Sequence, residues 1–234
     1  FKGSEKLAPG EASRILRELG AEENACTSDD YTAYYQVLAR DRLGVAFELE
    51  ADRLASLKLP AEEFKREIEV IKEERRQRTD DKPSALAYER FKAMAYPASG
   101  YHNPTIGWMA DLQRMQIDQL SDWYKAWYAP NNATLVVVGD VSVDEVKVLA
   151  ERYFGHIPRR SVPPARQPLE LAEPGERRIT LQVKTQLPSL LMGFNVPGLA
   201  TSKEATSVHA LRLISGLLDG GYSARLPTRL ERGE

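Results

Sequence analysis

The sequence from Glu67 to Gln77 is EIEVIKEERRQ, with glutamates at four of its first eight positions. Apolar residues recur here with helical spacing, because Phe64, Ile68 and Ile71 lie three or four positions apart. A proline suits the first turn of a helix, so the pattern predicts a helix over Pro60–Thr79. Which glutamates of this helix face solvent is the question on which fold and function both depend.

A helix advances by about 100° per residue. Measured from Phe64, Glu67 and Glu74 fall at roughly 300° and 280°, beside the apolar residues. Glu69 and Glu73 fall at roughly 140° and 180°, on the opposite side. We therefore expect Glu69 and Glu73 to be solvated, and Glu67 and Glu74 to lie two turns apart on the packed face.

A carboxylate on a packed face costs several kcal/mol unless it is paired, hydrogen-bonded or bound to a cation. One interpretation is that arginines satisfy Glu67 and Glu74, or that the face is partly wet. The other is a metal ligand with a supporting carboxylate. The three histidines, His102, His156 and His209, are scattered and form no HxxxH pair, so spacing alone does not complete a zinc site in this chain.

The rest of the sequence predicts an α+β fold, with a mostly antiparallel sheet and helices packed on one face. A lobe at 1–158 is followed by a proline-rich linker at 159–176 and by the start of a second, similar lobe at 177–234. We expect β-strands at 23–28, 31–39, 133–140, 176–185 and 189–196, and further helices at 11–19, 41–58, 83–95, 118–128, 143–154 and 202–218.

Composition excludes several classes of protein. The net charge of −2 over 234 residues, without a basic block, gives no support for nucleic acid as a partner. The longest apolar run, TLVVV, is too short to span a bilayer. With Cys26 as the single cysteine, no internal disulfide is expected. The opening FKGSEKLAPG has neither an initiator Met nor a signal-like segment, so we expect an internal piece of a longer protein.

Several segments together resemble the pitrilysin/insulysin family of zinc metallopeptidases, which has an inverted HxxEH motif and includes the mitochondrial processing peptidases. The matching segments are FKGSEKL, LRELGAEENACTSDDYTAYY, EIEVIKEERRQ, YHNPTIGW, WYAPNNATLVVVGDV and SLLMGFNVPG. They cover nearly the whole chain in the family's order. Any one of them is weak, but their order and spacing are fairly specific.

The resemblance implies a zinc ion. In the family the HxxEH motif lies just before the FKG-like segment, so it is expected immediately upstream of Phe1 and is missing from this chain. The family's third zinc ligand, a glutamate about 75 residues downstream, then corresponds to Glu74. A second glutamate seven residues earlier corresponds to Glu67, in a supporting role. These are the two residues that the helical wheel separates from their neighbours.

The resemblance also implies a peptide-binding strand. In the family, an Asn-Ala-x-Thr strand beside the zinc pairs with the substrate backbone, and here that pattern is Asn24, Ala25, Cys26 and Thr27. Such pairing relies on main-chain hydrogen bonds. The alternative is an ordinary edge strand. No thiol chemistry is implied for Cys26.

The resemblance thus implies a zinc-dependent endopeptidase that hydrolyses peptides or presequences in the full-length protein. We expect the chain by itself to bind zinc poorly and to be inactive. Two alternatives stay open: a non-catalytic homologue that serves as partner or scaffold of an active peptidase, and a peptide-binding module with a spent site. A homodimer or a heterodimer with a related subunit fits the resemblance. So does a soluble protein, cytoplasmic or periplasmic if bacterial.

Overall fold

The computed structural model describes residues 2–164, 170 and 175–231. Much of the predicted linker, 165–169 and 171–174, therefore lies outside the described residues. The chain divides into two compact units, Phe1–Pro188 and Ser189–Glu234. None of the helices formed by the described residues is both long and apolar enough to cross a membrane.

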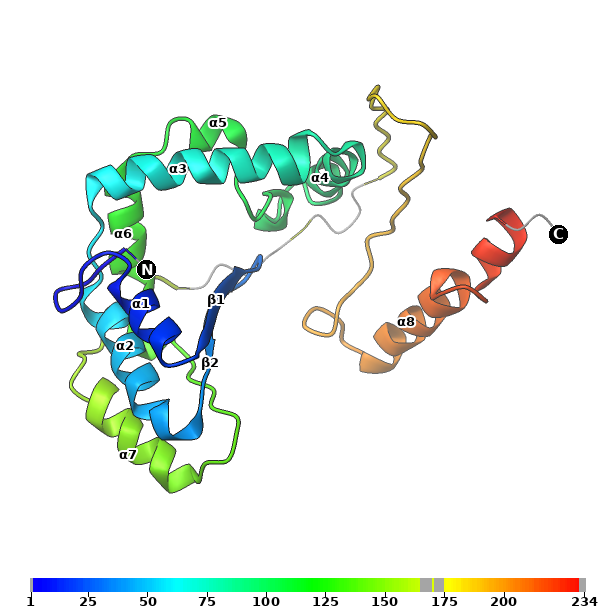
Figure 1. Cartoon of the computed structure of the whole chain (residues 1–234). Helices are drawn as coiled ribbons and strands as arrows, with labels where there is room; N and C mark the ends of the chain where they lie inside the picture. The colour runs from blue at the N-terminus through cyan, green and yellow to red at the C-terminus, as the bar shows by residue number, and fades with distance from the viewer. Residues whose placement is uncertain (1, 165–169, 171–174, 232–234) are drawn as a thin grey trace. The chain divides into compact units, whose positions relative to one another are not determined.

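The first unit contains one β-hairpin and seven α-helices among its described residues (Figure 1). They are α1 (Glu11–Glu18), β1 (Glu22–Thr27), β2 (Thr32–Val37), α2 (Leu43–Ser56), α3 (Ala61–Arg75), α4 (Pro83–Ala95), α5 (Met109–Leu112), α6 (Ile117–Trp127) and α7 (Val143–Phe154). A π-helical turn, Arg76–Asp80, extends α3. The second unit contains α8 (Ala205–Asp219) and a further π-helical turn at Pro227–Glu231. The α+β class is confirmed.

The hairpin is antiparallel, with Glu22 opposite Val37 and Thr27 opposite Thr32. It is the only sheet among the described residues. Helix α1 packs against β1. The apolar core lies between α2 and α7, where Ala51 and Leu54 contact Ile157. Phe47 of α2 meets Phe154 of α7 edge to face, with ring centroids 6.0 Å apart.

Three predicted strands are absent from the described residues. Residues 133–140 form no strand, and Val138 is 92% exposed. The described residues of 176–185 and 189–196 likewise form no ladder. A strand needs a neighbour to accept and donate its main-chain hydrogen bonds. Among the described residues these segments have none, so their β-propensity and apolar character are not sufficient to form a sheet.

Candidate metal and peptide site

Local charge patterning favours helix α3. Glu62 and Glu63 lie in its first turn and Lys72 and Arg75 in its last, which complements the helix dipole. Four ion pairs at three-residue spacing line its surface: Glu62–Lys65, Glu63–Arg66, Glu69–Lys72 and Glu73–Arg76. Two of the four glutamates singled out in the sequence, Glu69 and Glu73, are thus held on the solvent side by neighbouring bases.

Glu67 and Glu74 lie closer to the packed side of α3. Their side chains are 46% and 38% exposed, against 65% and 54% for Glu69 and Glu73. The wheel therefore gives the right order of exposure, but neither carboxylate is buried. The reason is that the described residues cover this face only in part, and Val70 beside the two glutamates is itself exposed.

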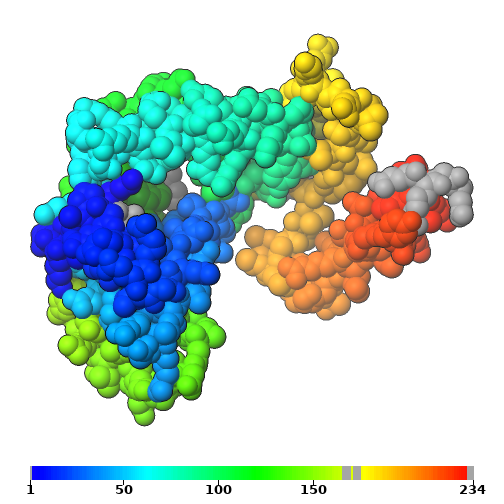
Figure 2. All heavy atoms as spheres, in the orientation of Figure 1, coloured from blue at the N-terminus to red at the C-terminus, as the bar shows by residue number. Residues whose placement is uncertain are grey.

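The N-terminal segment lies against α3 beside Glu67. Lys2 Nζ is 3.1 Å from a carboxylate oxygen of Glu67 and 3.6 Å from one of Glu63. Figure 2 shows these first residues, in dark blue, against the cyan helix. The hydrogen bond from Lys2 to Glu67, helped by the negative charge of that carboxylate, raises the pKa of Lys2.

Glu74 pairs with Arg78, one turn further along, at 2.8 Å. Arg78 is highly exposed, so this is a surface ion pair of small energy, and a cation can replace the arginine at little cost. A carboxylate oxygen is a normal zinc ligand. Across residues 2–164, 170 and 175–231, however, no group of three histidine, cysteine, aspartate or glutamate side chains could hold a metal ion. The described part of the chain thus fits zinc through one carboxylate and does not form a complete site.

The buried charge on α3 is Arg75, which the sequence analysis missed. Its guanidinium donates to both carboxylate oxygens of Glu89 on α4, at 2.7 and 3.0 Å, and to the Gly107 carbonyl at 2.8 Å. The side chains of Arg75 and Glu89 are 3% and 5% exposed. The wheel contains the signal, since Arg75 falls at roughly 20° from Phe64, in the middle of the apolar face. Glu89 raises the pKa of this already basic group.

The second candidate element is strand β1. Asn24, Ala25, Cys26 and Thr27 are all exposed, and one edge of β1 pairs with β2. The other edge has no strand beside it among the described residues. The Asn24 side chain accepts a hydrogen bond from the Ala25 amide at 2.8 Å. Cys26 is a free thiol. The four predicted residues therefore lie together on an accessible strand edge.

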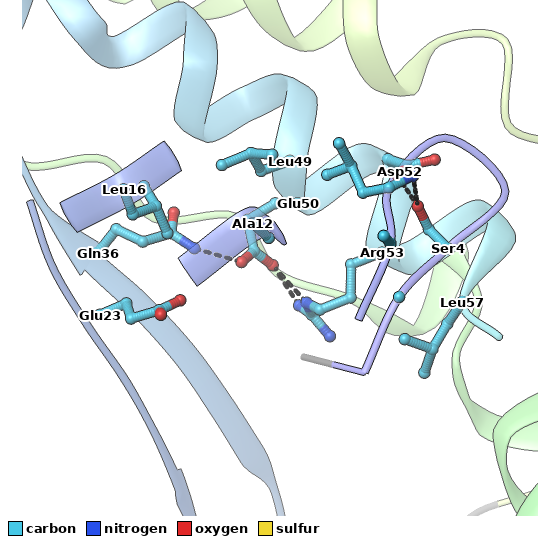
Figure 3. Close-up of a pocket in the computed structure, with 13 residues that line it drawn as sticks. Ser4, Ala12, Leu16, Glu23, Gln36, Leu49, Glu50, Asp52, Arg53 and Leu57 are labelled. Carbon is cyan, nitrogen blue, oxygen red and sulfur yellow. Dashed lines mark hydrogen bonds and ion pairs between the residues drawn. The ribbon is translucent and has the colours of Figure 1, made fainter. Parts of the chain in front are cut away.

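Helix α2 holds the base of the hairpin (Figure 3). Gln36 of β2 donates to Glu50, which also binds Arg53. The Arg53 guanidinium lies 3.6 Å from the centre of the Tyr34 ring. A cavity of about 20 Å³ lies beside these residues, lined also by Leu16, Ser4 and Asp52. Since this volume admits about one water molecule, the cavity supports the hairpin and is no peptide site.

Comparison with known proteins assigns the chain to a family. Residues 1–107 match the family described as Insulinase (Peptidase family M16), and residues 114–233 match the Peptidase M16 inactive domain. The chain belongs to peptidase family M16. The resemblance to pitrilysin-like peptidases is therefore confirmed.

Relatives in peptidase family M16 are named zinc proteases. The chain is 30% identical over 233 residues to the zinc protease PqqE of Helicobacter pylori, which covers 98% of the chain and 52% of the relative. It is 25% identical over 226 residues to the uncharacterized zinc protease YmxG of Bacillus subtilis. That match covers 97% of this chain and 53% of the relative. The chain thus spans about half the length of these relatives. Zinc is the cofactor of this family of metallopeptidases.

Solved structures agree on the fold. The crystal structure of a protease from Helicobacter pylori matches with a TM-score of 0.68 and 33% identity, over 73% of this chain and 41% of that one. The first half of the periplasmic protease PqqL from Escherichia coli matches with a TM-score of 0.66 over 73% and 38% of the two chains. At 22% identity the second likeness concerns the fold alone.

Proposed function

We propose that the full-length protein is a zinc-dependent endopeptidase that hydrolyses peptides or presequences. One observation carries the proposal: Glu67 and Glu74 lie two turns apart on the same side of α3, and the segment that begins with Lys2 contacts Glu67. In the family the HxxEH motif precedes this FKG-like segment directly. Its two histidines are then expected beside Glu67 and Glu74.

The two glutamates have different roles in this proposal. Glu74 offers a carboxylate oxygen as a zinc ligand once its surface pair with Arg78 is exchanged for the cation. Glu67, already paired with Lys2, orients a ligand or holds a proton, and loss of such a partner typically costs about 10–100-fold in affinity or activity. With zinc held there by Glu74, the site would gain a bound water whose pKa is lowered to about 7 and a Lewis acid able to polarise the scissile carbonyl.

Strand β1 is the proposed peptide-binding element. Its exposed edge at Asn24–Thr27 offers main-chain donors and acceptors to an extended substrate. The small side chain of Ala25 permits close approach. Because main-chain bonds supply most of the affinity in this mode, the enzyme should accept many unfolded sequences.

Substitution of Glu74 in the full-length protein tests the proposal. Glu74→Gln keeps the size of the side chain but removes the charged ligand. We expect it to lose bound zinc and peptide cleavage together. Glu73→Gln is the matched control, since Glu73 is the adjacent residue on the solvent side, paired with Arg76. Normal zinc content and normal cleavage in Glu74→Gln would defeat the assignment.

The wild-type full-length protein separates the enzyme from the non-catalytic alternative. In a non-catalytic partner or scaffold subunit, the residues preceding Phe1 in the full-length protein lack part of HxxEH. Such a wild-type protein neither holds zinc nor cleaves peptides, but it activates a related subunit when the two are mixed. An intact HxxEH in those residues, with zinc bound in the wild type, supports the enzyme.

A further inference from the structure

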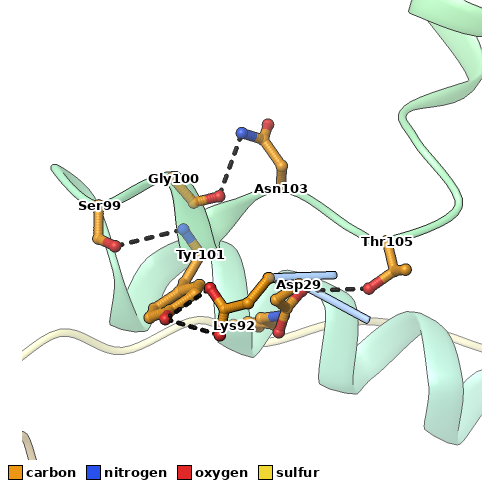
Figure 4. A network of polar contacts seen from close by, with 8 residues as sticks. Asp29, Lys92, Ser99, Gly100, Tyr101, Asn103 and Thr105 are labelled. Atoms are coloured by element: carbon orange, nitrogen blue, oxygen red, sulfur yellow. Dashed lines mark hydrogen bonds and ion pairs between the residues drawn. The ribbon is translucent and has the colours of Figure 1, made fainter. Parts of the chain in front are cut away.

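The turn of the β-hairpin carries two adjacent carboxylates, Asp29 and Asp30, and each is bound by another part of the first unit (Figure 4). Lys92 Nζ donates to both carboxylate oxygens of Asp29 at 2.8 Å, and Thr105 Oγ1 donates to Asp29 at 3.1 Å. The Tyr101 hydroxyl donates to Asp30 at 3.0 Å. The turn is therefore held by α4 and by the loop that follows it.

Helix α4 connects this turn to α3. Glu89 and Lys92 lie three residues apart on α4, so they project within one helical turn of each other. Glu89 binds Arg75 of α3, and Lys92 binds Asp29 of the hairpin. Helix α4 thus makes two ion pairs, one through its own carboxylate and one through its own ammonium group. The first joins α4 to α3, which carries Glu74, and the second joins it to the hairpin, which carries the exposed edge of β1.

The Lys92–Asp29 contact is well placed to hold the hairpin turn. The side chain of Lys92 is only 18% exposed, because its aliphatic part is covered, and both oxygens of Asp29 accept from its ammonium group. Residues 24–27 of β1 are exposed, whereas α1 packs against β1 and α2 binds Gln36 at the base of the hairpin. The position of Cys26 and Thr27, next to the turn, therefore depends on the contacts made at the turn, among which Lys92–Asp29 is the ion pair.

We propose that Lys92, through Asp29, is a positioning residue for peptide recognition: it fixes the exposed edge of β1 relative to α3. The inference rests on the proposed function, in which β1 binds the peptide and Glu74 holds zinc. Which bond of a bound peptide reaches the metal then depends on how β1 is held, since displacements of about 1 Å are enough to impair a reaction.

The test uses the full-length protein with Lys92→Met, which keeps the aliphatic chain and removes the charge. We expect the KM for an unstructured fluorogenic peptide to rise about two- to fivefold with kcat nearly unchanged, since partly exposed ion pairs are weak. We also expect additional cleavage positions in a longer peptide, detected by mass spectrometry, and faster hydrogen exchange of the β1 amides. Lys92→Arg should restore all three.

Lys125→Met is the matched control, because it removes an exposed lysine from α6. An active enzyme in which Lys92→Met leaves KM and cleavage positions unchanged overturns the inference and leaves the proposed function intact. A lower unfolding temperature with unchanged KM overturns it as well, because the contact is then only structural. If the wild type neither binds nor cleaves peptides, the proposed function fails and this role of Lys92 fails with it.

Discussion

Replacing Arg75 by methionine should destabilise the first unit severely. The substitution preserves much of the aliphatic volume but removes the guanidinium that binds Glu89 and the Gly107 carbonyl. The Glu89 carboxylate then remains buried at 5% exposure without its cation. Removing one partner of a buried pair typically costs about 3–5 kcal/mol, because the other charge is left uncompensated.

That cost can be measured by urea unfolding of the full-length protein, followed through hydrogen exchange of the α3 and α4 amides. With a denaturant dependence of about 1–3 kcal/mol per M, the midpoint should fall by about 1–5 M. The matched control is Arg76→Met, which breaks an exposed pair with Glu73 and should cost less than about 1 kcal/mol.

A double variant distinguishes the cost of an unpaired buried charge from the loss of the ion pair as a whole. Arg75→Met combined with Glu89→Leu removes both charges, and buried pairs replaced by apolar residues are often neutral in stability. We therefore expect the double variant to recover most of the loss caused by Arg75→Met. Equal midpoints for Arg75→Met and Arg76→Met would refute the claim that the buried pair fixes α3 on α4.

Two further predictions concern the site and its support. Glu67→Gln should reduce zinc affinity or peptide cleavage by about 10–100-fold while Glu69→Gln leaves both unchanged, as measured by zinc titration and kinetics of the full-length protein; equal effects of the two would contradict the role of Glu67. Burial, helped by the hydrogen bond with Tyr128, raises the pKa of Tyr34. Neutral Tyr34 therefore contributes fully to the free energy of unfolding below the unfolded-state pKa of about 10, and this contribution is lost as the pH rises above that value. Above that pH, urea midpoints should fall more steeply in the wild type than in Tyr34→Phe.

Elements with local signals could be predicted closely from the sequence. The predicted bounds of α4 and α7 match the observed helices Pro83–Ala95 and Val143–Phe154. Pro83 occupies the first turn of α4, and Ser142 with Glu145 forms a capping box at the start of α7. These signals act within a few residues, so they can be recognised in the sequence without knowledge of the tertiary fold.

Features that depend on distant partners could not be predicted in the same way. Residues 133–140 have the composition of a buried strand, but a strand also needs a neighbour, which no local pattern supplies. The wheel ordered the glutamates of α3 correctly but said nothing of Lys2 or Arg78 as their partners. Arg75 occupied an apolar position on that wheel, and only the fold reveals Glu89 as the reason.

Anomalous diffraction at the zinc absorption edge, from crystals of the full-length protein, shows directly whether Glu74 binds the metal. We expect a peak about 2.0–2.2 Å from a carboxylate oxygen of Glu74. Glu67 should lie in the surrounding shell without binding the metal directly. A zinc ion bound elsewhere in an active enzyme, with Glu74 still paired to Arg78, would contradict this assignment.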